Sequence, residues 1–222
     1  MGWPGGVHGP AGPVLVLLRF ASGLTSEEYV TRQGWRQASL ERCPLHPKGG
    51  CGLHRNGTYA RVTPVGTRIA RWYCPQGHCT FALLPDCLAA RFPGALADIE
   101  RVVAAVERSP SLAQAAALLR PDDISLPSAL RWLRRRLRPA RMAFQCWITL
   151  WPERLRGCLP RVEPLRAHLG CACVLVHGRA LAAEYLHELP RFVGFAPPAA
   201  RAGGRKRLDQ QHMGADPPAQ AP

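Results

Sequence analysis

Two short cysteine-rich turns constrain the fold more than any other feature of this sequence. The first turn reads "CPLHPKGGCG" from Cys43, and the second reads "CPQGHC" from Cys74. Each begins Cys-Pro and contains glycine, which permits the tight backbone needed to aim two side chains at one point. Between them, "GTYARVT" and "TRIARWY" are β-prone and flank Pro64-Val65-Gly66, a pattern that predicts a hairpin. Two ligand-bearing turns joined by a hairpin are the layout of a zinc ribbon.

The cellular compartment decides whether such cysteines bind a metal or form disulfides. No span approaches the roughly 20 apolar residues of a membrane helix. The apolar run "VLVLLRF" from Val14 lacks the basic segment and cleavage site of a signal peptide. We therefore expect a cytoplasmic protein with no membrane partner, in which thiols stay reduced and clustered cysteines bind metal. The odd number of cysteines, nine, agrees with this.

The two turns offer six candidates for the four positions of a tetrahedral Zn²⁺ site. Cys43 and Cys74 belong to every sensible set. His78 follows Cys74 by four residues behind a glycine, and Cys51-Gly52 has the ending of a zinc knuckle. The preferred structural zinc site is therefore Cys43, Cys51, Cys74 and His78, with His46 and Cys79 as alternates. The competing interpretation is a set of buried, inert thiols, which we also expect for Cys87, Cys146, Cys158, Cys171 and Cys173.

Basic charge is the second feature that indicates function. The chain has 29 Lys and Arg against 15 Asp and Glu, a net charge of +14, which favours a polyanionic partner. In "LPSALRWLRRRLRPAR", helical spacing puts leucines on one face and four arginines on another: Arg131, Arg134, Arg135 and Arg138. Like charges at this spacing repel one another unless an anion neutralises them. The pattern favours a DNA phosphate backbone, and the alternative is a solvated helix face.

Patterning along the chain predicts an α+β fold. We expect an N-terminal leader, a strand and a short helix in 1–39, a small β zinc ribbon in 40–92 and a helix-turn-helix region in 93–141. The third helix of that region is expected to end near Leu137. A helical C-terminal region should follow in 142–195, and a disordered basic tail in 196–222.

These motifs together resemble a known family. The succession Cys-Pro…Cys-Gly, "NGTYAR", "CPQGHCTFALLPD" and "RWLRRRLR" is similar to the zinc-ribbon and helix-turn-helix N-terminal region of bacterial insertion-sequence transposases and of an uncharacterised family related to them. The resemblance covers Cys43 to Arg138. It implies a DNA-binding module with metal ligands at Cys43, Cys51, Cys74 and His78.

The sequence departs from that family in two respects. The family usually has two Cys-x-x-Cys knuckles. Here the first turn is longer, and the second turn has His78 as its second ligand. The Asp, Asp, Glu site of a transposase catalytic domain is also missing, because the acids beyond Arg138 follow no strand pattern: Glu153, Glu163, Glu184, Glu188, Asp209 and Asp216. We therefore expect a DNA-binding protein of mobile-element origin that is not an enzyme. The alternatives are a protein-interaction module and, less favoured, a zinc enzyme.

Overall fold

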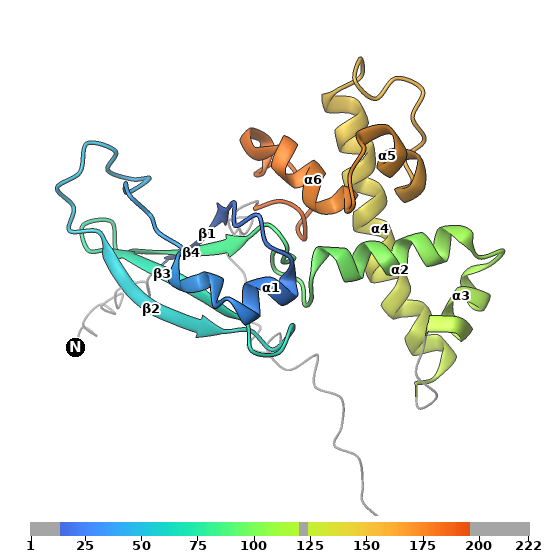
Figure 1. Ribbon diagram of the computed structural model, residues 1–222, viewed down its shortest axis with the longest axis horizontal. Coiled ribbons are helices and arrows are strands. Elements are labelled where there is room, and N and C mark those ends of the chain that lie inside the picture. The colour runs from blue at the N-terminus through green and yellow to red at the C-terminus, as the bar shows by residue number, and fades with distance from the viewer. Residues whose placement is uncertain (1–13, 120–123, 196–222) are drawn as a thin grey trace, which may run out of the picture.

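The computed structural model describes residues 14–119 and 124–195, which form a sheet-containing half and a helical half (Figure 1). The sheet, with its crossover segment, extends from Val14 to Pro85, and helices make up most of the described residues that follow. The prediction of an α+β fold is confirmed. The predicted leader before residue 14 and the basic tail from residue 196 lie outside the described residues.

The sheet has four strands in the order β1-β4-β3-β2. β2 (His54–Ala60) and β3 (Arg68–Cys74) form the predicted antiparallel hairpin, and β4 (Cys79–Pro85) pairs antiparallel with β3. β1 (Val14–Phe20) pairs in parallel with β4, with Val14 opposite Cys79. The strand expected to precede the cysteine-rich segment thus belongs to the same sheet as the hairpin. β4 and β3 are the two interior strands, and every residue of β4 is buried.

A long crossover connects β1 to β2. It contains α1 (Ser26–Thr31) and the short 3-10 helix η1 (Gly34–Arg36). Thr25 caps α1 in a capping box with Glu28. Tyr29 is fully buried, and its hydroxyl donates to the Arg68 carbonyl at 3.3 Å. The crossover is therefore held against β3 before the chain enters the first cysteine turn.

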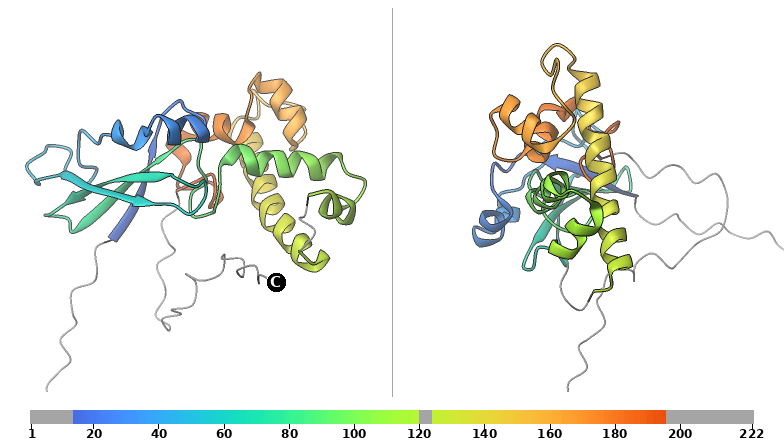
Figure 2. Two further views of the ribbon diagram at one scale, coloured as in Figure 1. Left: turned by 60° about the horizontal axis from the view of Figure 1, so that its bottom comes forward. Right: turned by 90° about the vertical axis from the view of Figure 1, so that its right-hand side faces the viewer.

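The helical half is built around one long helix. α2 (Leu96–Arg108) and α3 (Leu112–Leu119) pack against α4 (Leu126–Leu150), and α5 (Val162–Leu169), α6 (Val174–Leu181) and the 3-10 helix η2 (Ala183–Tyr185) follow. The apolar stripe of α2 is buried at Leu96, Ile99, Val103 and Val106. The right-hand view of Figure 2 shows α4 as one continuous helix.

α4 has 25 residues and does not end near Leu137 as predicted. Pro139 lies inside it, where proline removes a backbone hydrogen bond and normally breaks a helix. Packing outweighs this cost, since Ala140, Ala143, Phe144 and Trp147 are buried in the main hydrophobic core. The helix therefore runs across the expected boundary at residue 141 and joins the two predicted helical regions.

Two arginines connect the halves through backbone carbonyls. Arg61, just after β2, donates to the carbonyls of Ala89 and Phe92 at 2.9 and 2.7 Å. Arg179 of α6 is completely buried and donates to four carbonyls, those of Asp86, Leu88, Phe192 and Val193. Part of the chain's basic charge is thus used internally and is not exposed to a partner.

Candidate metal centre and basic helix

Four side chains converge at one end of the sheet. The donor atoms of Cys43, His46, Cys51 and Cys74 all lie within 4.8 Å of one another. The three cysteines are buried and the histidine is half-buried. This arrangement could hold a metal ion, because it joins four soft donors from different parts of the chain.

Local turns aim these donors at a common point. The His46 amide donates to the Cys43 carbonyl at 3.1 Å, which closes a tight turn between these two ligands. Cys74 is the last residue of β3, and its Sγ accepts a hydrogen bond from the Gly77 amide at 3.3 Å. Gly77 also allows a close approach, because a Cβ there would lie 2.6 Å from Leu45 Cδ1. The hairpin thus brings the end of β3 to the loop that follows η1.

The thiols of the cluster differ in acidity. Burial disfavours the Cys43 thiolate, but hydrogen bonds from His46 and from the backbone outweigh burial and lower the pKa of Cys43 to about 7. Burial raises the pKa of Cys74, against the hydrogen bond from Gly77. The Nδ1 atom of His46 lies 3.5 Å from Cys43 Sγ and 3.4 Å from Cys74 Sγ. The imidazole therefore faces two sulfurs with the same ring nitrogen.

The structure selects His46, the alternate, in place of His78. His78 is exposed, and its backbone has a φ of 44°. Its Nδ1 lies 3.5 Å from the Tyr73 hydroxyl. Cys79, the second alternate, is buried among the cluster's sulfurs and the ring of Phe81 but is not one of the four. The left-handed turn at His78 directs the chain into β4 and explains why this imidazole is not in the cluster.

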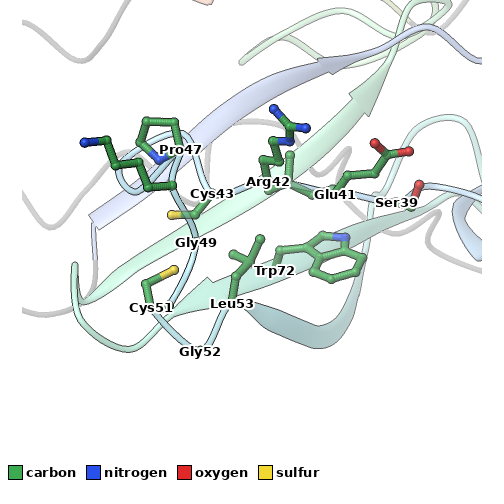
Figure 3. Close-up of a pocket in the computed structure, with 13 residues that line it drawn as sticks. Ser39, Glu41, Arg42, Cys43, Pro47, Gly49, Cys51, Gly52, Leu53 and Trp72 are labelled. Carbon is green, nitrogen blue, oxygen red and sulfur yellow. The ribbon is translucent and has the colours of Figure 1, made fainter.

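A pocket of about 920 Å³ lies beside the cluster. Cys43 and Cys51 line it together with the side chains of Leu40, Leu53 and Trp72 (Figure 3). The indole nitrogen of Trp72 is buried without a hydrogen-bond partner among the described residues. The pocket therefore lies between the loop that carries Cys43 and Cys51 and the Trp72 side chain on β3.

The remaining cysteines form no second centre within residues 14–119 and 124–195. Burial raises the pKa of Cys87 to about 11 and that of Cys173 to about 12. The Cys173 thiol donates to the buried carboxylate of Glu100 at 3.1 Å. Of the five thiols expected to be buried, only Cys87 is; the other four are partly exposed: Cys146, Cys158, Cys171 and Cys173.

α4 has six arginines, and the four of the predicted basic face are all exposed: Arg131, Arg134, Arg135 and Arg138. Arg131 donates to Ser128 Oγ at 3.1 Å. None of the four forms an ion pair with an acidic side chain in the part of the chain that the structure describes. Leu133 of the same helix is fully buried, so the predicted separation of apolar and basic faces is present at this position.

Comparison with known proteins gives no family. No family model matches the chain, and neither the curated proteins nor the solved structures contain a match. Among the helices in 14–119 and 124–195, none combines the length and apolar character required to cross a bilayer.

Proposed function

We propose that this chain is a non-catalytic, zinc-dependent DNA-binding protein. In this proposal the cluster of Cys43, His46, Cys51 and Cys74 holds a structural Zn²⁺ ion, and the exposed arginines of α4 bind the phosphate backbone. The observation that carries the proposal is the row of four exposed α4 arginines without ion-pair partners among the described residues.

The donor set supports zinc. In a tetrahedral site with Zn–S of about 2.3 Å and Zn–N of about 2.0 Å, sulfur and nitrogen lie about 3.5 Å apart. His46 Nδ1 lies 3.5 and 3.4 Å from the sulfurs of Cys43 and Cys74. Three thiolates and one imidazole complete four-coordination, which is typical of structural zinc and leaves no position for a reactive water. A structural role also suits the position of the cluster, which ties the crossover loop to the hairpin.

The charge distribution supports DNA. Between Arg131 and Arg166 the chain has ten arginines and two acids, Glu153 and Glu163. Both acids pair locally, Glu153 with Arg156 and Glu163 with Arg108 and Arg166. The α4 arginines are left to bind an external anion, and their guanidinium groups suit phosphate oxygens. The resemblance to transposase DNA-binding regions points in the same direction.

The test is the salt dependence of binding to random-sequence duplex DNA. Replacing Arg131, Arg134, Arg135 and Arg138 by glutamine should flatten the plot of log affinity against log salt by about three to four units, since each phosphate contact contributes about 0.9. The control replaces four other exposed arginines by glutamine: Arg36, Arg42, Arg154 and Arg191. Equal slopes in the two variants would refute the assignment to α4. Metal analysis of the same samples should give about one zinc per chain.

A second candidate function is a protein-interaction module. The 920 Å³ pocket beside the ligand loop favours it, because Leu40, Leu53 and Trp72 there provide an apolar lining. This candidate predicts a partner whose binding survives the α4 glutamine substitutions and is lost when Trp72 is replaced by alanine.

A further inference from the structure

A groove of about 700 Å³ is lined mainly by α2 and α4 and extends to the β2–β3 hairpin. The β2–β3 hairpin contributes Thr63, the 92–94 loop contributes Phe92, and α2 and α4 form the remaining walls. The α4 wall contains Arg131, Trp132, Arg135 and Arg136. Two of these, Arg131 and Arg135, are also in the exposed row proposed to bind DNA, so the groove opens beside that row.

The groove is strongly basic. Four arginines line it, three from α4 and Arg101 from α2, against one acid, Asp98. Asp98 pairs with Arg101 on the same helix. The three α4 guanidinium groups therefore have no acidic partner among the described residues, and the charge of the groove complements an anion.

Arg136 is held in place without such a partner. Its guanidinium carbon lies 3.9 Å from the centroid of the Trp132 ring and 5.2 Å from that of Phe92. Its Nη1 donates to the Trp132 carbonyl at 3.2 Å. Burial, with Arg135 nearby, lowers the pKa of Arg136 to about 10, so this side chain remains charged at neutral pH. The two aromatic rings thus preorganise the Arg136 guanidinium, and this side chain loses little conformational entropy when an anion binds.

Trp132 supplies a different kind of contact. It is 37% exposed, although tryptophan is among the largest apolar side chains, and it lies between the basic residues of the groove. Exposed aromatic rings interleaved with arginines are the arrangement by which proteins bind single strands, because bases stack on the rings while cations follow the phosphates. In a duplex the base faces are already stacked on their neighbours, so a ring in this position offers a duplex little.

We infer that this groove binds unpaired DNA, with a base packed on the exposed part of Trp132 and the adjoining phosphates on Arg131, Arg135 and Arg136. The inference rests on the proposed function, since Arg131 and Arg135 serve both surfaces. The inference adds that the protein prefers one form of DNA. Single-stranded DNA, or a strand separated from its complement, should bind more tightly than an intact duplex.

The experiment compares two labelled probes at one salt concentration, a 20-nucleotide mixed-sequence single strand and the duplex of the same sequence. The protein is the zinc-loaded full chain. Trp132→Leu should weaken single-strand binding about tenfold and duplex binding by less than threefold, whereas Trp132→Phe, which keeps a ring, should retain most single-strand affinity. The matched control is Tyr185→Leu, because Tyr185 is similarly exposed, at 39%, on η2. It should change neither affinity.

A crosslinking measurement tests the same inference without a substitution, and it can be used if Trp132→Leu does not fold. The unmodified chain is irradiated with a single strand containing bromodeoxyuridine, and the attached peptide is identified by mass spectrometry. Attachment within α4 at Trp132 supports the inference, and attachment only outside the groove overturns it.

The outcomes separate the two proposals. If the chain binds duplex with no preference for single strands and Trp132→Leu changes nothing, the groove inference falls and the proposed function stands. If the chain binds neither probe, the proposed function fails and the inference fails with it. If both affinities fall equally in Trp132→Leu, the ring acts only by supporting α4, and the inference is overturned.

Discussion

Replacing His46 by alanine tests the ligand set directly. Structural zinc binding releases about 10–16 kcal/mol in small domains, so one of four ligands contributes about 3 kcal/mol, or roughly a hundredfold in affinity. The loss should approach this value because His46 supplies the only nitrogen of the cluster and contacts two of its sulfurs, at 3.5 and 3.4 Å. The matched control is His78→Ala, which removes an exposed imidazole on the second turn. It should change zinc affinity by less than about threefold.

The assay is competition for zinc with a chromogenic chelator at pH 7, with far-ultraviolet circular dichroism of the same samples to follow folding. A hundredfold loss for His46→Ala together with an unchanged His78→Ala supports the cluster. The reasoning is refuted if His78→Ala weakens zinc binding as much as His46→Ala or more, because His78 would then be the ligand, as the sequence alone predicts.

Two further substitutions test the stability of the fold. Arg179→Met removes the four hydrogen bonds that a fully buried guanidinium donates to backbone carbonyls. The free energy of unfolding, measured by urea denaturation, should fall by about 3 kcal/mol or more. A loss below about 1 kcal/mol would contradict this account. Glu107→Gln tests a pH effect, because burial raises the pKa of Glu107 and its Oε1 is buried without a hydrogen-bond partner among the described residues. A carboxyl group with a raised pKa stabilises the folded state most at low pH, and this contribution is lost as the pH rises through that pKa. Glu107→Gln should therefore gain stability relative to the wild type as the pH rises above the ordinary carboxyl pKa, and a constant difference would contradict the shift.

The parts of the fold that depend on local signals were predictable. The hairpin follows from two β-prone runs around Pro64-Val65-Gly66, and α2 follows from its apolar stripe. The pairing of β1 with β4 was not predictable, because nothing near Val14 in the sequence specifies a partner as distant as Cys79. The length of α4 was missed because Pro139 is a local stop signal, and the packing that overrides it comes from the buried residues Phe144 and Trp147.

Three of the four preferred ligands, Cys43, Cys51 and Cys74, lie in the cluster, and the choice of histidine was the point of difference. The preference for His78 came from its glycine and its nearness to Cys74. Cys43 and His46 are separated by two residues, the same separation as in a Cys-x-x-Cys knuckle, whereas Cys74 and His78 are separated by three. That spacing was the available signal for His46. The zinc ion, the DNA contacts and the helix-turn-helix assignment stay predictions.

The parallel pairing of β1 with β4 has a consequence for how the chain is assembled. During synthesis β1 emerges well before β4, its neighbour in the described sheet, which lies about 65 positions later. Closing so long a loop costs entropy that grows with its length. All four donors of the cluster fall between these strands, so a bound ion would act as a cross-link that closes a loop of about 30 residues first and shortens the search that remains. Metal availability would then govern when the N-terminal strand can join the sheet, and a chain made without metal would keep β1 and the edge of β4 exposed for longer to pairing with other chains.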